Sequence, residues 1–140
     1  YIWHSKSTKR QKMISIERNQ KEQYTSVRLG NEKLDATISS DIKAYFVTIV
    51  QEGVRNIIFD MSQVRYSDSS GLSAILVGNR LCQEAGGSFV LCTLSDHVSK
   101  LVRISQLDTV LSIVPTLDEA VDLVMFNEIE NQLKADSQEG

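Results

Sequence analysis

Two serines, an aspartate and a glycine stand together in the segment 67–72, which reads SDSSGL. A short apolar run at 54–59 precedes this segment and predicts a strand buried on both faces. Small residues with helical spacing follow it and predict a helix. The carboxyl edge of such a strand is where open α/β sheets bind ligands and partners. The hydroxyl and carboxylate groups of the segment are therefore the first candidates for chemistry.

Ser69 and Ser70 fall at the N-cap or in the first turn of the predicted helix. The N–H groups there lack intrahelical partners and the helix dipole favours negative charge, so a phosphoryl group on Ser69 would meet free donors. Gly71 places no side chain beside this hydroxyl, which we expect to leave room for another protein's active site. Serine and aspartate are also favoured helix caps, each worth about 1 kcal/mol, and a cap needs no further function. The residues alone leave capping and phosphorylation both open.

The rest of the sequence predicts the elements that position this segment. The predicted order is β-β-α-β-α-β-α-β-α, with strands at 13–18, 24–29, 54–59, 89–92 and 110–114 and helices that begin near Ile38, Ser69, Ser95 and Thr116. Strands separated by helices imply parallel neighbours, while the opening hairpin adds an antiparallel pair. We therefore predict one α/β domain with a mixed five-stranded sheet and helices packed mainly on one face.

Polar segments flank this domain, which we place at residues 13–130. Residues 1–12 form a basic N-terminal tail with four basic side chains and no acid, and 131–140 form a polar C-terminal tail. The basic tail could touch an acidic partner, although a solvated extension is the simpler interpretation. The remaining residues carry 11 basic and 18 acidic side chains. This excess of acid argues against direct binding to nucleic acid.

Composition also excludes several kinds of site. Hydrophobic residues make up 41% and charged residues 24% of the chain, which are globular values. Cys82 and Cys92 lie in apolar stretches without metal-ligand spacing, so we expect buried free thiols, no metal and no cofactor. No stretch approaches the roughly 20 apolar residues of a membrane-spanning helix, and no signal peptide is recognisable. We therefore predict a cytoplasmic protein without membrane insertion.

The sequence does not support an enzyme. A serine hydrolase would need a glycine two residues before Ser69, and Ser67 stands there instead. His97 is the one histidine inside the predicted domain, and its place beside Asp96 fits the start of a helix better than a catalytic base. A phosphate-binding glycine-rich loop is absent, as are the paired acids of a two-component receiver.

The segment 68–72, followed by Ala74-Ile75-Leu76, resembles the phosphoacceptor motif of bacterial anti-sigma factor antagonists, the founding members of the STAS family. The similarity continues through Leu34-Asp35 before the first helix, the central strand 56–60 and the Gly86-Gly87 junction. It covers roughly residues 13–126 in the right order. Ser67 stands where the family usually has an apolar residue. The resemblance implies a single STAS domain.

The resemblance also implies a function. In that family the first serine after the aspartate is phosphorylated by a partner that is both a serine kinase and an anti-sigma factor; by position this is Ser69. A phosphatase would reverse the modification, and the switch would act on transcription. The partner-binding positions that it implies, together with neighbouring surface candidates, are Asp35, Asp68, Ser70, Gly71, Leu72 and Leu76.

Two questions stay open at this level. Leu72 and Leu76 fall off the stripe of small residues, so they could form an exposed apolar contact or pack under the neighbouring helix. STAS domains also serve as non-enzymatic subunits or regulators of membrane transporters, including lipid-transport ATPases. Such a role would use the same surface without obligatory phosphorylation.

Overall fold

The computed structural model describes residues 2–4 and 14–139 of the chain. Its strands are β1 (Ile2–His4), β2 (Ser15–Gln20), β3 (Thr25–Leu29), β4 (Lys33–Leu34), β5 (Ile57–Asp60), β6 (Tyr66–Ser67), β7 (Phe89–Cys92) and β8 (Ser112–Val114). Its helices are α1 (Ser39–Gln51), α2 (Ser69–Glu84), α3 (Asp96–Ile104), the short 3-10 helix η1 (Leu107–Thr109) and α4 (Leu117–Glu139). The four predicted helices and five predicted strands are all present, with ends that differ by a few residues.

The main sheet is mixed, with strand order β1-β2-β3-β5-β7-β8. The β2–β3 hairpin is antiparallel, and β3, β5, β7 and β8 run parallel to one another. These five strands confirm the predicted sheet. The short strand β1 pairs antiparallel with β2 and adds an edge strand inside the stretch that we predicted as a tail. The four basic residues of that stretch lie outside the described residues.

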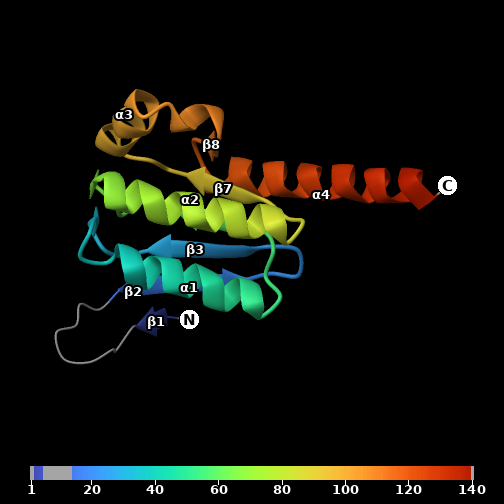
Figure 1. The fold of residues 1–140 in the computed structure, drawn as a ribbon, viewed down its shortest axis with the longest axis horizontal. Coiled ribbons are helices and arrows are strands. Elements are labelled where there is room, and N and C mark those ends of the chain that lie inside the picture. Colours follow the sequence, from blue (N-terminus) through green and yellow to red (C-terminus); the bar gives the residue numbers. More distant parts are fainter. Residues whose placement is uncertain (1, 5–13, 140) are drawn as a thin grey trace.

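The helices divide unequally between the two faces of the sheet. The larger core contains buried residues of α1, α2 and α3 on one face, and rings of Phe46, Phe59 and Phe89 meet there at centroid distances of 5.3–6.1 Å. A Cβ atom at Gly78 would lie 2.6 Å from the Phe89 ring, so a small residue lets α2 lie close to the sheet. Figure 1 shows α1 and α2 side by side in front of the strands.

Helix α4 covers the other face of the sheet. Ala120 and Val124 are buried there against Ile58, Val90 and Cys92. The helix then continues away from the body toward the C-terminus (Figure 1), through the segment that we predicted as a polar tail. None of the helices in the described part of the chain is long and apolar enough to span a bilayer.

Both cysteines are free and buried, as predicted. Burial in apolar surroundings raises the pKa of the Cys82 thiol to about 12 and raises the pKa of the Cys92 thiol above its ordinary value. Both thiols are therefore protonated core groups at neutral pH.

Candidate functional site at the N-terminus of helix α2

Helix α2 begins in the segment that the sequence singled out. Asp68 is the N-cap, and its Oδ1 accepts a hydrogen bond from the Gly71 N–H at 3.0 Å. Ser69 is the first helical residue and is exposed, whereas Ser70 is half-buried. The sequence left open whether the serines of this segment cap the helix. In the structure Asp68 is the cap, so Ser69 does not fill that role. The Ser69 side chain faces solvent.

The local geometry suits a negative charge on Ser69. The first donor within the helix is the Leu72 N–H, which bonds to the Asp68 carbonyl, so the N–H groups of Ser69 and Ser70 have no carbonyl of the helix to reach. The positive end of the helix dipole lies at the same place. A phosphoryl group there would find donors without unfolding the helix.

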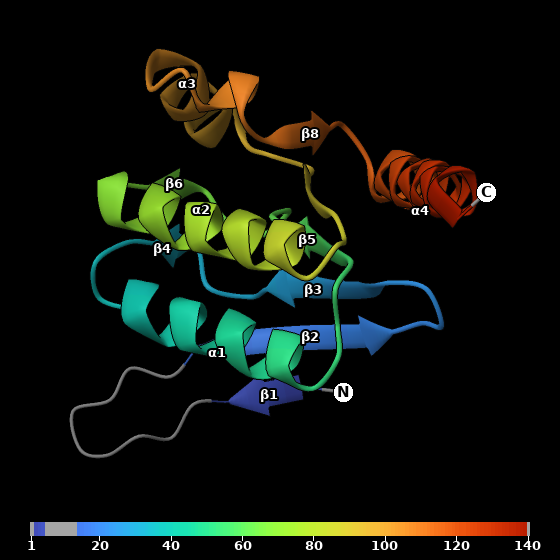
Figure 2. The ribbon, with the colours of Figure 1, turned by 45° about the vertical axis from the view of Figure 1, so that its right-hand side comes forward.

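A two-stranded parallel sheet carries Asp35 to the same place. In the β4–β6 pair, Leu34 is the register partner of Ser67, and the next residues along the chain are Asp35 and Asp68. Figure 2 shows β4 and β6 beside the N-terminal end of α2. Asp35 is half-buried and its Oδ1 accepts hydrogen bonds from the N–H and the hydroxyl of Thr37 at 3.0 and 2.6 Å. The two carboxylates thus flank the start of α2.

Ser67 and Gly71 allow this small sheet to pack closely against the start of α2. The buried Ser67 hydroxyl donates to the Leu34 carbonyl at 2.8 Å. A Cβ atom at Gly71 would lie 2.1 Å from that carbonyl oxygen and 2.2 Å from the Ser67 Oγ. Our explanation of Gly71 as room for another protein's active site is therefore wrong, because the space is filled from within. The Ser67 hydroxyl can be buried here because this carbonyl accepts its hydrogen bond.

The two leucines of α2 differ in exposure. Leu72 is only 5% exposed and belongs to the core, so it offers no contact surface. Leu76 is half-buried and packs against the edge of the core. Of the expected apolar pair, Leu76 alone reaches the surface.

An aromatic pair that we did not predict lies beside Ser69. Tyr66 of β6 is 43% exposed, and its ring stacks on His97 of α3 with centroids 5.0 Å apart and an interplanar angle of 25°. No local pattern in the sequence marks this pair, because the two-residue strand β6 is too short to show alternation. His97 is 31 residues away from Tyr66 and could not be linked to it without the tertiary structure.

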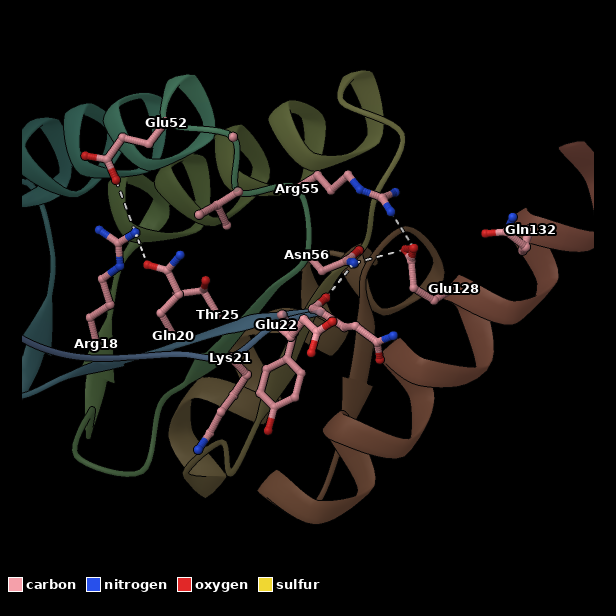
Figure 3. Close-up of a pocket in the computed structure, with 14 residues that line it drawn as sticks. Arg18, Gln20, Lys21, Glu22, Thr25, Glu52, Arg55, Asn56, Glu128 and Gln132 are labelled. Atoms are coloured by element: carbon pink, nitrogen blue, oxygen red, sulfur yellow. Dashed lines mark hydrogen bonds and ion pairs between the residues drawn. The ribbon is translucent and has the colours of Figure 1, made fainter.

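A hollow of about 550 Å³ lies at the opposite end of the parallel strands, beside the starts of β3 and β5. Figure 3 shows that charged side chains of its wall pair with one another, Arg18 with Glu52 and Arg55 with Glu128. Buried Asn56 donates to the Gln23 carbonyl and to Glu128, and accepts from the Ser88 N–H. These bonds connect α4 with three loops. The polar side chains at this end of the strands therefore have a structural role.

Metal chemistry has no support in the described part of the chain. No group of three or more histidine, cysteine, aspartate or glutamate side chains there is arranged to hold an ion. The surface around Ser69 instead presents hydroxyl groups, carboxylates and an aromatic ring, and these groups suit modification and binding.

Comparison with known proteins identifies the family of the chain. Residues 15–120 match the family model of the STAS domain. BtrV of Bordetella bronchiseptica, named as a candidate anti-sigma factor antagonist, is 30% identical over 67 residues, which cover 48% of this chain and 58% of that protein. The match thus spans little more than half of that relative.

Solved structures share the fold. A candidate anti-sigma factor antagonist from Thermotoga maritima superposes with a TM-score of 0.71 at 22% identity, over 79% of this chain and 94% of that one. The Bacillus cell fate determinant SpoIIAA, in its phosphorylated form, gives a TM-score of 0.60 at 25% identity, over 78% of this chain and 98% of that one. With the family model matching most of the chain, this protein belongs to the STAS domain family and has the fold of the anti-sigma factor antagonists.

Proposed function

We propose that this protein is a partner-switching regulator of the anti-sigma factor antagonist type, controlled by phosphorylation of Ser69. The observation that carries this proposal is the exposed Ser69 hydroxyl at the first position of α2, next to an aspartate that already caps the helix. SpoIIAA, which shares the fold, has been solved in a phosphorylated form. The protein would act by binding and not by catalysis.

The unmodified surface would dock on a serine kinase that is also an anti-sigma factor and displace the factor that the kinase holds. Asp35 and Asp68 flank this surface, Leu76 supplies apolar contact, and Ser70 lies beside the acceptor. Gly71 and Leu72 do not face the partner and only support this surface from within, the first by its close approach to β4 and the second by core packing.

Phosphorylation would oppose docking by charge. A phosphoryl group adds about 1.5 to 2 negative charges beside two carboxylates, and burying them in an interface is costly. A loss of about 3–4 kcal/mol would weaken binding by two to three orders of magnitude. A phosphatase would restore the docking form.

The test is phosphorylation in a lysate of the source cells. The purified protein is incubated with ATP and lysate, and intact and peptide masses are compared with those of Ser69→Ala and Ser70→Ala variants. We expect one added phosphate on Ser69 in the wild type and in Ser70→Ala, and none in Ser69→Ala. If no form gains phosphate while other serine kinases of the lysate are active, the switch is wrong. A STAS role beside a membrane transporter, without phosphorylation, would then be the better hypothesis.

A further inference from the structure

We propose that Tyr66 and His97 form a docking platform beside Ser69, on which the kinase that modifies Ser69 lays a cationic arginine or lysine side chain. The inference rests on the proposed function, because it assigns part of the same partner's binding surface. It goes further by naming two residues that bind the kinase and the type of kinase side chain that they bind.

The position of Tyr66 follows from the strand that carries it. Successive side chains of a strand point to opposite sides. Ser67 points inward to the Leu34 carbonyl, so Tyr66 points outward, three residues before Ser69. Tyr66 remains 43% exposed although His97 covers part of its ring. A large aromatic side chain left half open beside a modification site is a candidate contact, since tyrosine is enriched at the centres of protein interfaces.

The platform is held in place before any partner arrives. On one side, Tyr66 is the register partner of Lys33 in the β4–β6 pair. On the other side, His97 lies in the first turn of α3, whose N-cap Ser95 accepts from the Val98 N–H at 3.3 Å. Because both backbones lie in regular structure and the two rings stack on each other, a partner loses little binding energy in ordering them.

The charges around the platform favour a cation. Asp35 and Asp68 follow the two paired strands, and Asp96 directly precedes His97. The bases there are Lys33, the register partner of Tyr66, Lys100, one turn after His97 in α3, and Arg65, which lies 3.9 Å from the Glu32 carboxylate. With Glu32 included, the surface still has an excess of carboxylates over bases. The face of an aromatic ring also attracts cations, most strongly when the contact is shielded from water. An arginine or lysine of the partner would therefore meet both the ring and the acidic surroundings. A phosphate on Ser69 would attract the same cation, so the switch requires that burying the phosphate among the carboxylates costs more than this attraction returns.

The experiment measures the rate of Ser69 phosphorylation against protein concentration, using the Ser69 kinase activity fractionated from source-cell lysate. Tyr66→Leu keeps an apolar side chain but removes the ring, and should raise KM about 5- to 30-fold with kcat unchanged. Tyr66→Phe keeps the ring face and should stay within about two-fold of the wild type. His97→Ala should raise KM as a loss of positioning, and His97→Phe should restore it.

Phe126→Leu is the matched control, because Phe126 is a 59% exposed aromatic residue on α4, outside the platform. Its KM should equal that of the wild type, and circular dichroism and thermal melts check that every variant is folded. An unchanged KM for Tyr66→Leu would overturn the platform while leaving phosphorylation of Ser69 intact. An equal loss in Tyr66→Phe would also overturn it, because the hydroxyl and not the ring face would then be the contact. Absence of phosphate on wild-type Ser69 would instead refute the proposed function, and the platform with it.

Discussion

At the scale of single residues, Gly71 shows how a motif position can be fixed by packing inside its own fold. Its missing side chain makes room for the Leu34 carbonyl, 2.1 Å from where a Cβ atom would stand. That oxygen belongs to the β4–β6 pair and also accepts the Ser67 hydroxyl, so it cannot move without loosening both. A glycine beside a candidate phosphoacceptor serine thus need not serve an incoming kinase.

We predict that Gly71→Ala destabilises the protein. Alanine gains about 1 kcal/mol in helix propensity, but the overlap with a backbone oxygen costs more. The expected net loss is about 1–3 kcal/mol of unfolding free energy, measured by urea titration. Ser73→Ala, at a half-buried position of the same helix, should stay within about 0.5 kcal/mol of the wild type or gain stability. An unchanged urea midpoint for Gly71→Ala would show that the close approach is absent in solution.

The position of the candidate site could be predicted from the sequence, but the packing around it could not. Ser69 could be singled out because a strand end, a helix start and a family resemblance coincide there. The burial of Leu72 could not, because helical spacing alone did not show how closely α2 lies on the sheet. The stack of Tyr66 on His97 depends on a contact between distant segments and leaves no local pattern.

At the scale of elements, apolar periodicity predicted the four helices and the five main strands. The two-residue strands β4 and β6 were inside predicted loops, because they are too short to show an alternating pattern. Yet this pair carries Asp35 to the start of α2. The elements that position the site are thus the ones that periodicity detects least well.

The loop from β7 to α3 contains backbone strain that can be relieved. Thr93 follows β7 with φ of 60°, a left-handed conformation that is unfavourable for a β-branched residue by about 1–2 kcal/mol. Asparagine tolerates this region, so Thr93→Asn should raise the unfolding free energy by about 1 kcal/mol. Urea titration measures it. Thr48→Asn in α1 is the control, because both residues have similar helix propensities there. A Thr93→Asn protein no more stable than the wild type would mean that other contacts hold the loop.

At the scale of the whole molecule, the polar groups at the two ends of the parallel strands are arranged differently. The edge around Ser69 presents an exposed hydroxyl, carboxylates and an aromatic face. At the opposite end, charged side chains pair with one another. Hydrogen bonds of Arg55, Asn56 and Glu128 connect α4 to the loops there. The core between them is continuous from α1 to α3, and Ser69 is not part of it.

This separation predicts a switch of the surface and not of the fold. Ser69 is exposed and precedes the first intrahelical donor of α2, so a phosphate there should change the unfolding free energy by less than about 1 kcal/mol. The same phosphate should weaken binding to the kinase by about a hundredfold or more. Urea titration and calorimetric binding on the phosphorylated and unmodified protein measure the two quantities, and hydrogen exchange should change only at the start of α2. If phosphorylation instead lowered stability by several kcal/mol, with exchange rising through the core, the switch would work by unfolding and the binding surface would be secondary.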